Sequence, residues 1–258
     1  MSLTVTTRSG IANVTLDRPG RRNAMLASMW QALPKVMTEL DADPAVSLVV
    51  LRGSGGHFGA GNDIADFLAH CVSVDQARSY AWAMAAAMRS VEALAKPIVA
   101  AIEGDCYGAS VALTLACDLR VAADNAGFAI TPAKLGVLYL SSDLARLSAL
   151  IGPARVRDMI FTARRLDARE AQNIGLVDRL LPHAGFEEGL VEVLRSIAIG
   201  SPVTIRGTKA MLRRLSPGDA PPETEETIAG FVAATQGADF KEGAQAFLEK
   251  RRPNFVHG

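Results

Sequence analysis

One arrangement constrains the fold more than any other, and it occurs twice: an apolar β run leads into a glycine-bearing turn and then into the apolar start of a helix. Residues 46–51 precede the turn at 59–61, and residues 98–102 precede the turn at 104–110. The second run is apolar throughout, which is typical of a strand buried on both faces. The two units predict a mixed αβ core that holds both turns together.

The first turn consists of Gly59, Ala60 and Gly61, so its backbone can approach a ligand closely. Two backbone N–H groups that converge on one carbonyl oxygen stabilise the negative charge developing there, and such an oxyanion hole is often the largest single catalytic contribution. We expect the turn at residues 104–110 to supply the second N–H group. The first turn carries neither G-x-G-x-x-G nor Gly-Lys-Ser/Thr, which argues against a nucleotide phosphate site.

Composition excludes several classes of protein. Lys and Arg number 27 and Asp and Glu also number 27 among 258 residues, which argues against nucleic-acid and membrane-surface partners. The three cysteines are an odd number without C-x-x-C spacing, so we expect neither disulfides nor a metal site, and a reducing cytoplasm fits best. No signal-peptide pattern and no apolar run of roughly 20 residues is visible, so a cytoplasmic protein that does not enter a membrane is predicted.

The remaining pattern predicts the order of the other elements. A hairpin is expected from residues 3–7 and 11–16, helices at 23–40 and 75–95, short strands at 119–122 and 128–130, and an irregular segment at 131–136. From residue 141 onward nearly everything has helical periodicity, apart from a strand-like run at 176–180. We expect an αβ core at residues 1–200 and a helical segment at 201–258.

Short motifs in a fixed order then extend over nearly the whole chain. They include Leu16-Asp-Arg-Pro19, Arg22-Asn-Ala-Met25, Phe58-Gly-Ala-Gly-Asn-Asp-Ile64, Lys96-Pro-Ile-Val-Ala-Ala-Ile-Glu-Gly104, Ala116-Cys-Asp118, Lys134-Leu-Gly136, Ala171-Gln-Asn-Ile-Gly-Leu-Val177 and Phe247-Leu-Glu-Lys-Arg-Arg-Pro-Asn-Phe255. In content and order they resemble the crotonase superfamily, also called the enoyl-CoA hydratase/isomerase family.

This resemblance implies an α/β fold, a spiral of ββα units with two roughly perpendicular sheets. It also implies C-terminal helices that build a homotrimer, commonly paired into a hexamer. The implied substrate is an acyl-CoA thioester, with coenzyme A as part of the substrate and no tightly bound cofactor. The thioester carbonyl is expected between the backbone amides of Asn62 and Ala109, although the family usually has a second glycine at the latter position.

Residues matching the family's CoA-binding positions form a further set of expectations. Basic side chains at Arg21, Arg22 and Lys250 are candidates for the CoA phosphates or adenine, and solvated surface charge is an equally good interpretation. The other candidates lie beside the first turn, and they are Ala24, Ala60, Asp63 and Ile64. The alternative role for Asp63 is to cap the helix that begins at Ile64.

The departures from the family pattern concern proton transfer. Family hydratases use two glutamates, and the matching positions here are Ala112 and Pro132. A one-base isomerase pattern would place its glutamate near Leu140, which is also inert. Neither pattern can move a proton with these side chains.

Tyr139, Asp143 and Lys134 are the titratable side chains left in the neighbourhood. For Tyr139 a substrate-contacting hydroxyl and a packed aromatic ring are both open, and for Asp143 a helix N-cap is the alternative to proton transfer. Residues 131–139 and the C-terminal tail resemble the methylmalonyl-CoA decarboxylase branch, where a tyrosine matches Tyr139. That branch's histidine at the Asn62 position and glutamate at the Ala112 position are absent.

Three hypotheses follow. The first is an acyl-CoA enzyme in which the Asn62 and Ala109 amides stabilise a thioester enolate and Tyr139, with Asp143 behind it, supplies the remaining polar contact. The second is a decarboxylase acting on a malonyl-type CoA ester. The third is a catalytically silent CoA-binding or oligomerising subunit.

Overall fold

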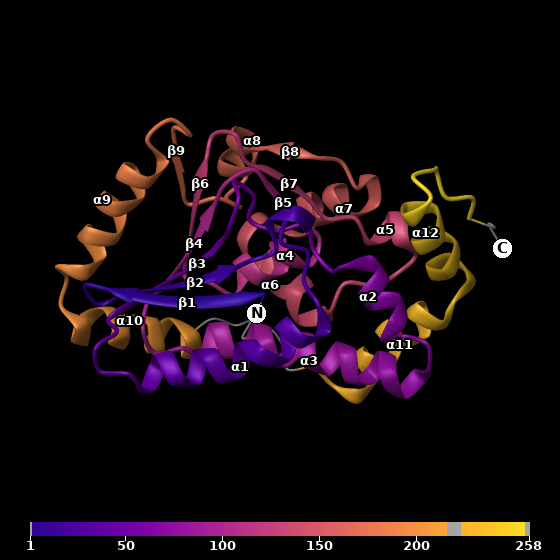
Figure 1. Ribbon diagram of the computed structural model, residues 1–258, viewed down its shortest axis with the longest axis horizontal. Helices are drawn as coiled ribbons and strands as arrows, with labels where there is room; N and C mark the ends of the chain where they lie inside the picture. Colours follow the sequence, from indigo (N-terminus) through magenta and orange to yellow (C-terminus); the bar gives the residue numbers. More distant parts are fainter. Residues whose placement is uncertain (1, 216–222, 256–258) are drawn as a thin grey trace.

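Two sheets form the centre of the molecule, as seen in the computed structural model, which describes residues 2–215 and 223–255 (Figure 1). The larger sheet has the order β1 (Leu3–Arg8), β2 (Ile11–Leu16), β3 (Leu48–Gly53), β4 (Ile98–Ile102), β6 (Leu119–Ala123), β9 (Arg179–Leu181). The smaller sheet has the order β5 (Asp105–Tyr107), β7 (Gly127–Ala129), β8 (Leu166–Asp167). All pairs in the larger sheet are parallel except β1 with β2, which form the predicted hairpin.

The helices follow the strands in a repeating pattern. Their bounds are η1 (Pro19–Arg21), α1 (Ala27–Ala42), α2 (Ile64–Ala69), α3 (Val74–Ala93), α4 (Ala109–Leu115), α5 (Pro132–Leu135), α6 (Ser141–Ile151), α7 (Pro153–Thr162), α8 (Ala168–Asn173), α9 (Phe186–Ala198), α10 (Pro202–Leu215), α11 (Glu225–Gln236) and α12 (Ala238–Leu248). The order β1–β2–α1, β4–β5–α4 and β6–β7–α5 gives the expected ββα units.

The central strands β3 and β4 are buried on both faces of the larger sheet, as their continuous apolar runs predict. Val49, Leu51 and Ile98 belong to the main core, whereas the alternate residues Val50 and Val99 pack against α9 on the opposite face. Figure 1 shows α9 on one side of the sheet and α4 with α6 on the other. Successive side chains point to opposite faces of a strand, so this burial accounts for the absence of polar residues in β4.

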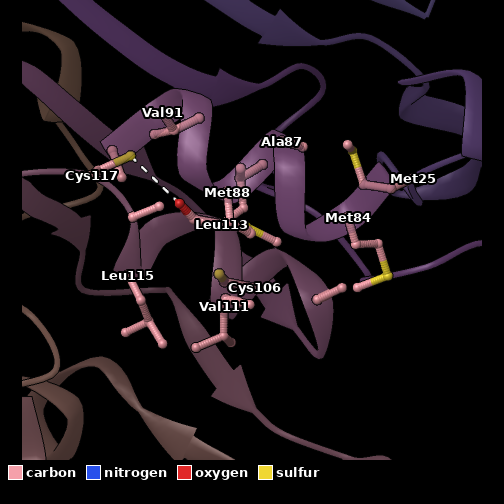
Figure 2. Packing of buried hydrophobic residues seen from close by; sticks show 14 of the residues in the cluster. Met25, Met84, Ala87, Met88, Val91, Cys106, Val111, Leu113, Leu115 and Cys117 are labelled. Atoms are coloured by element: carbon pink, nitrogen blue, oxygen red, sulfur yellow. Dashed lines mark hydrogen bonds between the residues drawn. The ribbon is translucent and has the colours of Figure 1, made fainter. Parts of the chain in front are cut away.

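Part of the main core lies between α3 and α4. Figure 2 shows Met88 of α3 beside Leu113 of α4, with Cys106 next to Val111. Cys106 is a free thiol that is fully buried, and burial raises its pKa well above the ordinary value. Its environment is that of a small core residue rather than a nucleophile.

Several predicted boundaries differ from the structure. The helix predicted at 23–40 begins only at Ala27, because Asn23 has a left-handed φ of 55° and its side-chain Nδ2 donates to the carbonyl oxygens of Ser54 (2.8 Å) and His57 (2.7 Å). The segment predicted as irregular contains the short helix α5, and β5 and β8 were not predicted. These elements have two to four residues, too few for periodicity to be visible.

The C-terminal helices contribute to the same core as the sheet. α11 packs against α3, and α12 packs against α5 and α2. The buried side chains of Ile228, Phe231 and Phe240 join the main hydrophobic cluster. The division at residue 200 and the oligomeric role of this segment stay predictions. In the ranges that the structure describes, no helix has the length and apolarity needed to cross a membrane.

Candidate active site

The two glycine-bearing turns lie against each other, as expected. The Gly59 N–H donates to the Asp105 carbonyl oxygen (3.0 Å), and the Tyr107 N–H donates to the Gly59 carbonyl oxygen (2.9 Å). A parallel bridge between Gly59 and Cys106 continues this pairing. The first turn is therefore hydrogen-bonded along β5, which leads directly into α4.

Gly61 sits where the backbones of the two turns come close together. Its φ is +88°, and a Cβ at this position would lie 2.9 Å from the Tyr107 carbonyl oxygen and 3.3 Å from the Ala109 nitrogen. Its N–H donates to the Ser110 Oγ at 3.0 Å. A glycine is required here both for its backbone conformation and for space, and this contact brings the backbone of Asn62 beside that of Ala109.

The N–H groups of Asn62 and Ala109 are both available to a ligand. Ala109 is the first residue of α4, where an N–H has no acceptor within the helix. Among the described residues, neither N–H donates to a backbone or side-chain acceptor. The Asn62 side chain is otherwise engaged, since its Oδ1 accepts from Trp30 Nε1 at 2.9 Å.

Asn62 and Ala109 both line a cavity of about 260 Å³. The wall is mainly apolar, and residues from α2, α3, α5, α11 and α12 contribute to it. Its large apolar side chains are Ile64, Phe67, Met84, Leu135, Val137, Leu138, Leu140, Phe231 and Phe247. Its polar side chains are Asn62, Thr131, Lys134, Tyr139, Asp143 and Arg251. An apolar enclosure with a few polar groups is typical of a small-molecule site.

Tyr139 lies on the cavity wall just before α6. Its hydroxyl donates to the Gly108 carbonyl oxygen at 2.7 Å. Burial raises the pKa of this phenol well above its ordinary value, and the nearby Asp143 raises it further. The hydroxyl therefore keeps its proton at neutral pH, and that proton is directed at the turn that carries Ala109.

Asp143 is 1% exposed and lines the same cavity. Its pKa is raised to about 7, mainly by burial. The negative charges of Glu223 and Glu92 also raise this pKa, whereas the Arg146 guanidinium at 3.0 Å lowers it. A carboxyl group with a pKa near neutrality is suited to accepting and returning a proton.

The alternative role of Asp143 as a helix N-cap is wrong. The N-cap of α6 is Leu140, which offers no side-chain cap. Glu223 takes this task instead, because its Oε1 accepts from the Ser142 N–H (2.8 Å) and its Oε2 from the Ser141 hydroxyl (3.1 Å). The pKa of Glu223 is lowered from its ordinary value. Burial alone would raise this pKa, but the hydrogen bonds from Ser141, Ser142 and Thr227 outweigh the effect of burial. Sequence reasoning missed Glu223 because 80 or more residues separate it from its partners.

The positions that would hold the hydratase glutamates carry no ionisable group. Ala112 is fully buried inside α4, and Pro132 is the buried first residue of α5, on the cavity wall. Leu140, the position of the one-base isomerase, also lines the cavity. Lys134 lines it as well, but its Nζ donates to the Ala163 carbonyl oxygen at 2.9 Å.

The residues predicted for CoA binding separate into two groups. Ala60 and Ile64 line the cavity, and Ala24 is buried close to the first turn. Asp63 caps α2 by accepting from the Asp66 N–H, and it pairs with Arg18 at 3.0 Å. The capping alternative for Asp63 is thus confirmed.

The basic candidates lie outside the cavity wall. Arg21 and Lys250 are exposed, and Arg22 pairs with Asp105 at 2.9 Å. Besides Lys134, the cavity wall includes a second cation, Arg251, which is paired with Glu242 at 2.6 Å and was not predicted from the sequence. His57 is a loop histidine, since its Nδ1 accepts from the Asp105 N–H at 3.1 Å and it does not line the cavity.

Comparison with known proteins identifies the family. The sequence profile described as enoyl-CoA hydratase/isomerase matches residues 6–258. The peroxisomal Delta(3,5)-Delta(2,4)-dienoyl-CoA isomerase of Arabidopsis thaliana is 30% identical over 261 residues, covering 97% of this chain and 94% of that protein. Both matches extend over nearly the whole chain.

Solved structures agree with this result. An enoyl-CoA hydratase/isomerase family protein from Hyphomonas neptunium has 38% identity and a TM-score of 0.82, covering 100% of this chain and 98% of the other. Methylmalonyl-CoA decarboxylase in complex with 2S-carboxypropyl-CoA has 28% identity and a TM-score of 0.85, covering 100% and 99%. The expected crotonase fold is confirmed, and the chain is an enzyme of the enoyl-CoA hydratase/isomerase family.

Proposed function

We propose that this enzyme forms an enolate from an acyl-CoA thioester whose carbonyl oxygen lies between the N–H groups of Asn62 and Ala109. The observation that supports this best is the pair of unengaged backbone N–H groups, on two turns packed together at Gly61, on the wall of a mainly apolar cavity. Removing water from such a site strengthens the interaction between the amides and the developing charge.

Asp143 is the proposed proton-transfer group. Its pKa of about 7 allows it to remove a proton from the acyl chain and to return it at another carbon. Hydration would need further groups to position and activate water, and Ala112 and Pro132 cannot do so. An isomerase-type proton shift therefore fits the site better than hydration, and the similarity to a dienoyl-CoA isomerase agrees with it.

Deuterium exchange at the α-carbon of butyryl-CoA in heavy water tests the enolate directly, because it needs no knowledge of the natural acyl group. We expect exchange by the wild-type enzyme and a loss of about 100-fold or more in Asp143→Asn, the lower part of the range for a positioned general base. Asp158→Asn is the matched control, since it removes an exposed carboxylate paired with Arg164. Hydration of crotonyl-CoA should stay near background.

Three outcomes would contradict the proposal. Absence of exchange in the wild-type enzyme would rule out enolate formation by proton removal, and full exchange in Asp143→Asn would rule out Asp143 as the base. Rapid hydration of crotonyl-CoA would show that Ala112 and Pro132 do not exclude water activation.

Decarboxylation of a malonyl-type CoA ester is the second candidate, supported by the structural similarity to methylmalonyl-CoA decarboxylase. Loss of CO2 leaves the same enolate but requires no base to form it. Methylmalonyl-CoA turnover in both the wild-type enzyme and Asp143→Asn would therefore favour this reaction. If butyryl-CoA binds in calorimetry but neither exchange nor decarboxylation is observed, the hypothesis of a catalytically silent CoA-binding subunit would be favoured.

The remaining expectations belong to the same proposal. The exposed side chains of Arg21, Arg22 and Lys250 would meet the phosphates and adenine of CoA outside the cavity. No cofactor besides the CoA of the substrate is required for this chemistry. A homotrimer or a dimer of trimers in the cytoplasm completes the proposal.

A further inference from the structure

We infer that Tyr139 acts on the reaction through the Gly108–Ala109 peptide bond, as a positioning residue that orients and polarises the Ala109 N–H without contacting the substrate. The inference rests on the proposed function, because it assigns a task to the group behind one of the two enolate-stabilising amides. It differs from both alternatives considered for Tyr139, a hydroxyl that meets the substrate and a ring that only packs.

The Gly108–Ala109 peptide bond links the Tyr139 hydroxyl to the Ala109 N–H. The Tyr139 hydroxyl donates to the Gly108 carbonyl oxygen at 2.7 Å. In a planar trans peptide the carbonyl oxygen of one residue and the N–H of the next point in opposite directions. A donor bound to the Gly108 oxygen therefore lies directly behind the Ala109 N–H, which has no acceptor in the part of the chain that the structure describes and can meet the thioester oxygen on the other side.

The orientation of the Gly108–Ala109 peptide depends on its hydrogen bonds. Gly108 has a φ of +53°, a conformation in which the backbone of glycine is permissive. Its carbonyl oxygen accepts from the Val111 N–H at 3.0 Å and the Ala112 N–H at 3.4 Å, in addition to Tyr139. Val111 and Ala112 belong to α4 itself, whereas Tyr139 lies outside it. The hydrogen bond from Tyr139 therefore fixes the Gly108–Ala109 peptide relative to the cavity wall.

Polarisation follows from the same contact. Hydrogen bonds in a chain strengthen one another by about 10–30% per bond, because each donor draws electron density through the group it binds. A hydrogen bond at the Gly108 oxygen thus makes the Ala109 N–H a stronger donor to a negatively charged enolate oxygen. The effect is larger when the oxygen carries more charge, so it favours the transition state over the bound thioester.

The expected magnitude separates this role from direct proton transfer. One oxyanion donor contributes about 100-fold to 1,000-fold in rate. If the tyrosine strengthens that donor by about 10–30%, its hydroxyl contributes about twofold to eightfold. A residue that transferred a proton to the substrate would contribute about 100-fold or more.

The test compares wild-type enzyme with Tyr139→Phe, using butyryl-CoA with a 13C-labelled thioester carbonyl. Infrared difference spectra give the carbonyl stretching frequency of the bound ligand, and α-carbon deuterium exchange gives the rate. We expect the wild-type enzyme to lower the frequency, Tyr139→Phe to lower it less, and its rate to fall about twofold to eightfold with the same pH dependence. Tyr80→Phe is the control, because this buried hydroxyl has no hydrogen-bond partner in the described ranges and does not line the cavity.

A second variant keeps the ring and the hydroxyl and so avoids a packing defect. Replacing Tyr139 with 3-fluorotyrosine makes the phenol more acidic and therefore a stronger donor. We expect the carbonyl frequency of bound butyryl-CoA to fall further than in the wild-type enzyme. A merely structural tyrosine would leave this frequency unchanged.

The outcomes also distinguish this inference from the proposed function. If the wild-type enzyme lowers the carbonyl frequency and Tyr139→Phe lowers it equally, the inference alone is wrong. A rate loss of about 100-fold in Tyr139→Phe would also overturn it, because the hydroxyl would then meet the substrate. If the wild-type enzyme itself causes no frequency change, the proposed oxyanion site is wrong, and the inference is wrong with it.

Discussion

Replacing Asp143 with asparagine should change how the stability of the protein depends on pH. Asp143 is 1% exposed, and burial together with nearby Glu223 and Glu92 raises its pKa to about 7 despite the Arg146 partner. In an unfolded chain the pKa of an aspartate is about 3.9. Between these two values the native state holds a proton that the unfolded state has released, so raising the pH through this range destabilises the native state.

The size of the effect follows from the two pKa values. A difference of about 3 in pKa corresponds to about 4 kcal/mol in the free energy of unfolding. The stabilisation is complete below about pH 4, is reduced by about 2 kcal/mol at pH 5.5, and is lost above about pH 7. Asparagine does not titrate, so the variant should gain about 4 kcal/mol relative to wild type from pH 4 to pH 8.

Urea unfolding followed by tryptophan fluorescence from pH 4 to pH 8 measures this difference. Asp158→Asn removes an exposed carboxylate that also pairs with an arginine, and its curve should run parallel to that of the wild type. Parallel curves for Asp143→Asn and the wild type would refute the reasoning, because Asp143 would then be ionised throughout the range. Such a result would mean that the Arg146 ion pair outweighs burial.

Three further changes test the same site. Glu223→Gln removes a charge that raises the pKa of Asp143, so the rise of the α-carbon exchange rate with pH should move from about 7 to lower pH in a pH–rate profile. Gly61→Ala forces a Cβ to 2.9 Å from the Tyr107 carbonyl oxygen, and exchange assays should show a loss of about 100-fold or more, the contribution of one oxyanion donor. Ser110→Ala leaves the Gly61 N–H without its acceptor, and urea unfolding should show a destabilisation of about 1–3 kcal/mol.

The parts of the fold with strong local patterns were predictable from the sequence. The hairpin turn at Ser9 and Gly10 has positive φ at both residues, as its composition indicates. The apolar strand β4 is buried on both faces, and α3 nearly matches its expected range. The start of α1 was not predictable, because Asn23 leaves the helical conformation for hydrogen bonds to residues more than 30 positions away.

The candidate site divides in the same way. Its backbone part could be placed from the sequence, since Gly61 and Gly108 mark the two turns whose backbones come close to each other. Its side-chain part could not, because Phe231 of α11 and Arg251, just after α12, join the cavity wall from far along the chain. The periodicity within one segment does not predict which distant helix will cover a cavity.

Under the proposed function, this division shows how a chain could keep a family's substrate while its reaction changes. Every residue except proline supplies a backbone N–H, so an alanine at position 109 preserves the donor that a glycine would give. A side-chain carboxylate, in contrast, is lost when the residue changes. Ala112 and Pro132, at the positions expected to match the hydratase glutamates, carry no ionisable group. The proposal assigns proton transfer to Asp143, whose pKa depends on burial and on Glu223, a residue outside the sequence motifs. Long-range packing around one carboxyl group would then decide the reaction, and the Glu223→Gln pH–rate profile tests that packing directly.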